Sequence, residues 1–120
     1  NKNSISGHNT ISQMFKNQTG HFDIPPLKSY NKSLALNYEI HPNVKKSWGY
    51  GLLINDQPLA HGRSTGSGSW AGVLNTYFWI DHKNDLAGVF LTQILPCYSH
   101  QLLKAFKTFE ELSYKFFIKS

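Results

Sequence analysis

The sequence predicts an α+β fold: an antiparallel sheet of three to four strands, with one helix from the N-terminal end of the chain and another from the C-terminal end. Between residues 45 and 95, short runs rich in β-branched and aromatic residues alternate with turn sequences. Residues 98–118 instead repeat apolar side chains at helical spacing. With 120 residues, the chain is long enough for one domain with a buried core.

Residues 1–20 predict a short helix followed by an irregular segment. Ser6 is a candidate N-cap, and Gly20 would end the helix because glycine adopts the left-handed conformation at little cost. The apolar face of this helix would hold Ile11, Met14 and Phe15. Residues 21–44 predict an extended connector, since Pro25-Pro26 cannot continue a helix.

Four segments predict the strands: KSWGYGLLIN (46–55), LAHGRSTG (59–66), WAGVLNTYFWID (70–81) and LAGVFLTQIL (86–95). Turn sequences at residues 55–58 and 81–85 separate them, and such short links favour antiparallel hairpins. In the last two segments, apolar residues occupy both odd and even positions, so apolar side chains would point to both faces of the sheet. This pattern predicts strands covered on both faces.

Residues 98–118 predict a second, longer helix. Pro96 would end the last strand, and Ser99 is a candidate cap for the helix. The predicted apolar stripe consists of Leu102, Leu103, Phe106, Phe109, Leu112, Phe116 and Phe117.

The composition excludes several classes of partner and cofactor. The formal charge is +5, but Lys45-Lys46 is the longest basic run, so we expect no nucleic-acid partner. No apolar run reaches the length of a membrane span. The six histidines show no metal-binding spacing and Cys97 is the single cysteine, so we expect neither a metal nor another cofactor.

Two short segments match sequence motifs that contain a catalytic serine in known enzymes. Gly62–Gly66 matches G-x-S-x-G, and Ser64 precedes Asp81 or Asp85 and His100 in the order of a hydrolase triad. That motif requires a strand before the serine and a helix directly after it, whereas a Gly/Ser-rich loop follows Ser64. Ser29 and Lys32 match S-x-x-K, but they lie in the polar connector. We interpret both as chance matches, and keep Ser64, Ser67 and the neighbouring His61 as secondary candidates only.

Trp70-Ala71-Gly72 is the stronger candidate because a Gly/Ser-rich loop leads there into a strand. Backbone N–H groups with little side-chain cover could meet a substrate oxyanion at such an edge. A bulge with a core tryptophan explains the same residues equally well.

These residues also resemble a known family. GRSTGSGSWAGVLNTYFWID, LAGVFLTQILP and a final helix ending in ELSYK are similar to the C-terminal part of serine β-lactamase-related hydrolases, the class C-like group with family VIII esterases and CubicO proteins. ISGHNTISQMFKNQTG, PPLKS and KSWGYGLLIN resemble the preceding helix, connector and strand of that family. The resemblance implies that residues 1–120 are one partial domain, corresponding to part of the α/β domain of the β-lactamase/transpeptidase-like fold.

The resemblance also implies a division of the active site. The nucleophilic serine and lysine of S-x-x-K, and a tyrosine, would lie in an N-terminal portion outside these 120 residues. Trp70-Ala71-Gly72 would replace K-T-G, with Val73 and its neighbours offering oxyanion support. A shifted alignment places Gly66-Ser67-Gly68 there instead. The missing lysine of K-T-G favours ester over β-lactam substrates.

We therefore expect this chain alone to be catalytically silent. Its expected partners are the missing portion of the hydrolase, a small ester or amide substrate, and further copies of the chain through exposed apolar surface. We expect a bacterial protein of the cytoplasm or periplasm. The alternative is a non-catalytic remnant that serves as a binding or self-associating module.

Overall fold

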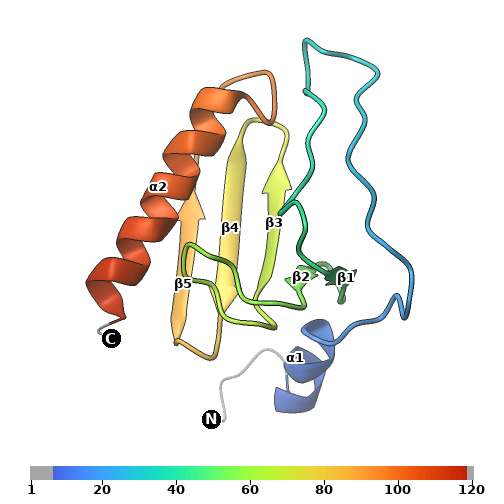
Figure 1. The fold of residues 1–120 in the computed structure, drawn as a ribbon, viewed down its shortest axis with the longest axis vertical. Helices are drawn as coiled ribbons and strands as arrows, with labels where there is room; N and C mark the ends of the chain where they lie inside the picture. The colour runs from blue at the N-terminus through green and yellow to red at the C-terminus, as the bar shows by residue number, and fades with distance from the viewer. Residues whose placement is uncertain (1–6, 119–120) are drawn as a thin grey trace.

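The computed structural model describes residues 7–118 (Figure 1). In this part of the chain, a short helix precedes five strands, and a long helix follows them. The elements are α1 (His8–Met14), β1 (Lys46–Trp48), β2 (Leu53–Asn55), β3 (Gly68–Gly72), β4 (Thr76–Asp81), β5 (Leu86–Phe90) and α2 (His100–Phe117). None of the described helices is long and apolar enough to cross a membrane.

The described strands form one antiparallel sheet in the order β1-β2-β3-β4-β5. The predicted α+β class and antiparallel pairing are confirmed, with five strands in place of three to four. Two of the predicted strands each contain a turn. Gly51 (φ 73°) lies in the turn between β1 and β2, and Asn75 (φ 58°) lies in the turn between β3 and β4. Left-handed backbone at these residues lets the chain reverse where the composition alone suggests continuous strands.

Residues 59–66 are a loop, so the strand predicted there is wrong. The Leu59 N–H donates to the Arg63 carbonyl (2.9 Å), and the Gly62 N–H donates to the Leu59 carbonyl (3.1 Å). Gly62 has a φ of 134°, and a Cβ at this position would lie 2.3 Å from the Tyr114 ring. The loop therefore needs glycine here to turn back closely over α2.

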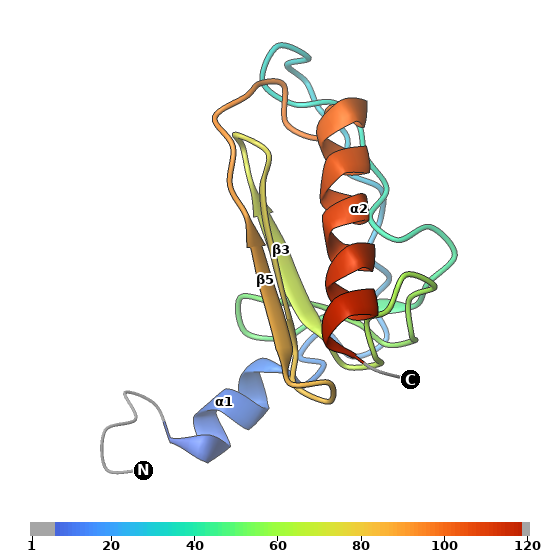
Figure 2. The ribbon, with the colours of Figure 1, turned by 90° about the vertical axis from the view of Figure 1, so that its left-hand side faces the viewer.

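One face of the sheet is covered by α2, as the edge-on view in Figure 2 shows. Tyr77 and Trp79 point to this face; the Trp79 side chain is fully buried, and its ring contacts those of Phe106 and Phe109. Gly88 on β5 pairs with Trp79, and a Cβ on Gly88 would lie 2.0 Å from the indole ring. The indole ring thus occupies the space that a side chain at residue 88 would need.

The opposite face of the sheet is largely uncovered by the described residues. Val89 is 62% exposed and Ile80 37% exposed. Figure 2 shows α1 on this side at one end of the sheet only, where the Phe15 ring contacts that of His82. The prediction that the strands are covered on both faces is therefore wrong for residues 7–118.

The helices also differ in detail from the prediction. α1 ends at Met14, well before Gly20, and Gly7 occupies its N-cap position; the expected cap Ser6 lies outside the described residues. Ser99 does occupy the N-cap position of α2, without a side-chain capping bond.

The predicted stripe of α2 is only partly buried. Glu110 and Tyr114 are buried, whereas Leu112, Phe116 and Phe117 remain exposed. The face of α2 that meets the sheet therefore carries polar groups that require partners.

We expect Gly88→Ala to destabilise the fold by about 1–3 kcal/mol, because the added methyl group must displace the buried Trp79 ring. Chemical denaturation followed by tryptophan fluorescence measures this free energy of unfolding. Ala87→Ser, at the exposed neighbouring position, is the control and should change stability by less than about 0.5 kcal/mol. Equal stabilities of the two variants would contradict the close contact.

Candidate functional site

A buried ion pair fixes the loop of residues 59–67 to α2. The Arg63 Nε and Nη2 groups both donate to the Glu110 carboxylate, with Nη2 2.8 Å from Oε2. Arg63 is 2% exposed and Glu110 1% exposed. Burial opposes ionisation of Glu110, but hydrogen bonds from His61 and Arg63, and the Arg63 charge, hold its pKa below the ordinary value. The pair therefore persists as a charged, two-point link.

A second link involves Ser64, the next residue of the loop, and the Asp81 carboxylate at the end of β4. The Ser64 N–H donates to Asp81 Oδ2 (2.8 Å), and the Ser64 hydroxyl donates to Oδ1. The Asn84 side-chain amide (2.9 Å) and the Tyr114 hydroxyl (2.8 Å) donate to Oδ2 as well. Burial alone would raise the pKa of Asp81, but these hydrogen bonds, led by those of Ser64, lower it well below the ordinary value.

This geometry gives Ser64 a structural role. Its hydroxyl contacts the Asp81 carboxylate directly, whereas a serine nucleophile needs a neighbouring base that can take its proton. The depressed pKa of Asp81 makes that carboxylate a weak base. The Ser67 hydroxyl donates to the Ser64 carbonyl (2.8 Å), so it also supports the loop.

Ser29 and Lys32, which match the S-x-x-K motif, do not contact each other through a hydrogen bond. The Ser29 hydroxyl donates to the Asn31 carbonyl (3.0 Å), and the Lys32 amine donates to the Asn37 side chain. Each group thus has its own local partner in the connector. In the described part of the chain, no group of three or more histidine, cysteine, aspartate or glutamate residues is arranged to hold a metal ion.

The residues Trp70, Ala71 and Gly72 form the end of β3, where its edge becomes free. The Asn55 N–H donates to the Ser67 carbonyl (3.2 Å), so the backbone of Ser67 points toward β2. Backbone direction alternates along a strand, so Ala71 has the same direction as Ser67. Val73 lies just beyond the end of β3, as the first residue of the turn to β4. The pairing of β3 with β2 stops at Ser69, which lies opposite Leu53, the first residue of β2. The Ala71 N–H therefore lies beyond the part of β3 that β2 covers.

A small hollow lies at this edge of β3. Trp70 and Ala71 form one side, and Tyr38, Ile40 and His41 of the connector form the other. Its volume is about 40 Å³, which is room for about one water molecule. The Trp70 ring meets the Trp48 ring edge to face at 4.5 Å and is only partly buried. Of the four candidates, Trp70 and Ala71 border this hollow, Gly72 is the last residue of β3, and Val73 begins the turn to β4.

The sequence did not identify the Arg63–Glu110 pair. A signal was present, because Glu110 follows Phe106 by four residues and precedes Tyr114 by four residues, on one helical face. A carboxylate in line with large aromatic side chains indicates a buried charge, which requires a cationic partner.

A scan against protein-family models finds no match, and neither does a search of curated proteins. Solved structures do match. The chain is similar to unliganded simvastatin synthase (LovD) from Aspergillus terreus, as its selenomethionyl derivative, with a TM-score of 0.62 and 25% identity over 64% of this chain. It is also similar to the LovD9 mutant of that enzyme, with a TM-score of 0.58 and 27% identity over 60% of this chain.

The chain spans about a fifth of the length of these structures, 20% and 19% respectively. LovD is a β-lactamase-like acyltransferase. The described sheet and helices match a part of that fold, and the likeness supports the β-lactamase/transpeptidase-like superfamily.

We expect Asp81→Asn to destabilise the protein by about 2–4 kcal/mol at pH 7, because a charged acceptor of several hydrogen bonds is lost. The folded state lowers the pKa of Asp81, so its contribution is complete above the unfolded pKa, about 3.9, and is lost as the pH falls below that value. The difference from the original protein should therefore shrink between about pH 5 and pH 2. Urea denaturation across this pH range measures it.

Asp85→Asn is the matched control, since Asp85 is exposed in the same hairpin and asparagine tolerates its left-handed backbone (φ 52°). This variant should keep the stability of the original protein at every pH. A cost of Asp81→Asn that is the same at pH 3 and pH 7 would show that the charge is not what stabilises the loop.

Proposed function

We propose that this chain is the C-terminal part of a β-lactamase-like serine enzyme that transfers an acyl group from a small ester or amide through an acyl-serine. The chain would supply one wall of the substrate cleft and support for the oxyanion. The serine and lysine of the S-x-x-K element, and the tyrosine, would come from a portion of the protein outside these 120 residues. The similarity to LovD and the free end of β3 support this division.

The observation that carries the proposal is the free edge of β3 at Ala71, from which the chain continues through Gly72 into Val73. Attack of a serine hydroxyl on a carbonyl carbon places negative charge on the carbonyl oxygen. Backbone N–H groups fixed at about 2.7–3.1 Å from that oxygen stabilise the charge as it develops. The Gly66-Ser67-Gly68 alternative is less suitable, because the Ser67 backbone faces β2.

The side chain at residue 70 bears on the choice of substrate. Trp70 would stand where related β-lactamases and peptidases carry the lysine of K-T-G. An indole cannot pair with the carboxylate of a β-lactam, whereas it offers apolar contact to an uncharged acyl group. We therefore propose esters as the substrate class, in the manner of the family VIII and CubicO branch.

The proposal is tested first on the chain as it stands. We expect no serine-dependent hydrolysis of p-nitrophenyl butyrate and no adduct with a fluorophosphonate probe, because Ser64 and Ser29 are held by structural hydrogen bonds. Ester turnover that Ser64→Ala abolishes would place the nucleophile within this chain and overturn the proposal. An upstream reading frame without S-x-x-K would overturn it too.

In the longer protein, Val73→Pro should lower kcat/KM for the ester by about 10²–10³-fold, because proline has no N–H for the oxyanion. Val73→Ala is the control, since it keeps the N–H and changes only a side chain that is 55% exposed. Both variants should unfold at the same denaturant concentration. Equal activities would show that the N–H of residue 73 does not serve the reaction.

A second candidate function is that of a non-catalytic, self-associating module. Large apolar side chains are exposed, including Leu91 (75%), Phe116 (77%) and Phe117 (74%). Exposure of this kind favours an interface. Sedimentation velocity at rising concentration separates the two functions. A stable dimer of an inactive chain, weakened by Leu91→Lys but not by Gln101→Lys, would favour the module; a monomer would exclude self-association.

A further inference from the structure

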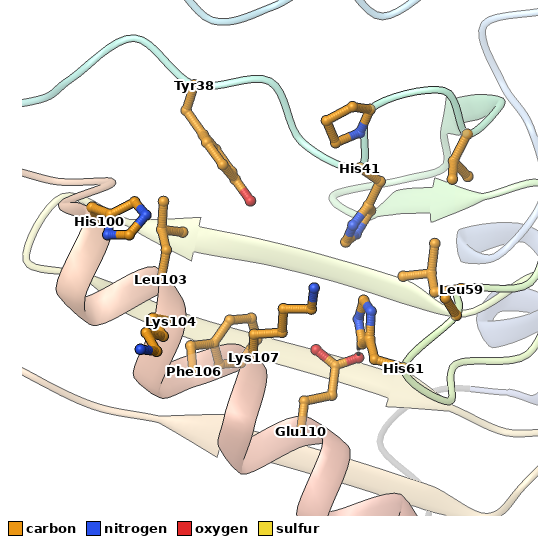
Figure 3. A pocket seen from close by; sticks show the side chains of 13 residues that line it. Tyr38, His41, Leu59, His61, His100, Leu103, Lys104, Phe106, Lys107 and Glu110 are labelled. Carbon is orange, nitrogen blue, oxygen red and sulfur yellow. Dashed lines mark ion pairs between the residues drawn. The ribbon is translucent and has the colours of Figure 1, made fainter.

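A cavity of about 570 Å³ lies between α2 and two loops, on the face of the sheet that α2 covers (Figure 3). The loops are residues 38–44 of the connector and residues 59–61. This volume lies within the range of about 300–1,000 Å³ that is typical of small-molecule sites. Leu59, Leu103 and Phe106 give the cavity apolar walls. It would therefore accept a ligand with an apolar body.

Polar groups from three segments converge on this cavity. Figure 3 shows the Tyr38 hydroxyl, the His41 imidazole and the Lys107 amine projecting into it. Burial raises the pKa of Tyr38, so its hydroxyl remains a hydrogen-bond donor at neutral pH. Burial, together with the Arg63 charge, lowers the pKa of His41 to about 3, so this ring remains neutral. Two neutral groups and one ammonium thus face the same space.

The balance of charge at the cavity is positive. Its one described acidic side chain, Glu110, is neutralised by Arg63 and also lies 3.1 Å from His61 Nε2. Lys104 and Lys107 line the cavity as well, and neither forms an ion pair within residues 7–118. Their charges remain available to an anion.

An unused donor lies in the hollow that adjoins the cavity. The hollow at the edge of β3 shares Tyr38, His41 and Phe106 with the cavity and also includes Arg63. Arg63 Nη1 is buried, with no hydrogen-bond partner among the described residues. A buried cationic donor without a partner is costly, so an acceptor that reaches this hollow would be favoured.

We propose that this cavity binds a small molecule with one carboxylate on an apolar body, such as a medium-chain carboxylic acid. The carboxylate accepts hydrogen bonds from the Tyr38 hydroxyl and the Lys107 amine, and the apolar body lies along Leu103 and Phe106. A phosphate dianion fits less well, because the Glu110 carboxylate is close by. None of residues 70–73 lines the cavity, although the cavity and the β3 hollow share Tyr38 and His41, so the binding test does not depend on the acyl-transfer function.

The test uses the ¹⁵N-labelled chain with octanoate and, as the uncharged probe, 1-octanol. Octanoate should shift the amide resonances of residues 38–44, 59–63 and 100–107. Lys107→Gln should weaken octanoate binding about tenfold by removing a charge-assisted hydrogen bond. It should leave octanol binding unchanged. Lys115→Gln, two turns further along α2, is the matched control and should bind octanoate like the original protein.

Tyr38→Phe provides a second variant, because it keeps the ring and removes only the hydroxyl; octanoate binding should weaken several-fold. Equal affinities for octanoate and octanol would overturn the proposal. So would equal effects of the two lysine substitutions, or shifts confined to the exposed side of β5 around Val89.

Discussion

The carboxylate of Asp81, at the end of β4, joins three parts of the molecule that are distant in sequence. Ser64 binds it from the loop before β3, Asn84 from the following hairpin, and Tyr114 from the last turns of α2. A buried carboxylate without such donors would cost several kcal/mol. The positions of loop, hairpin and helix are therefore mutually dependent, and each is correct only when the other two are in place.

Arg63 strengthens this arrangement because it precedes Ser64 directly and pairs with Glu110, one helical turn before Tyr114. Arg63 is thereby tied to α2 directly, whereas Ser64 is tied to Asp81 of β4, which Tyr114 of α2 also binds. The Arg63 guanidinium also lies 5.7 Å from the Trp79 ring centre, so the polar links and the aromatic core support each other. This loop leads into the first residue of β3, so its links to α2 and β4 fix the start of the strand. An oxyanion-binding edge at the other end of β3 would require a strand fixed in this way.

The two proposed sites share the connector. Tyr38 and His41 border both the hollow at the β3 edge and the cavity beside α2. The connector is fixed locally by backbone hydrogen bonds of Tyr38 with Leu27 and of Leu36 with Cys97. A segment without helix or strand thus helps to shape both candidate sites, which is common where scaffold elements position loops for binding.

The sequence by itself determined the α+β class, the antiparallel pairing and the C-terminal helix, because apolar periodicity and turn residues act over a few neighbouring positions. It also singled out residues 70–73, and their role stays a prediction. Only the tertiary structure decided that Ser64 is a structural hydrogen-bond donor, that residues 59–66 are a loop and that Glu110 is buried with Arg63. These outcomes depend on partners 17 and 47 residues apart, and local patterns carry no information about which distant groups will meet.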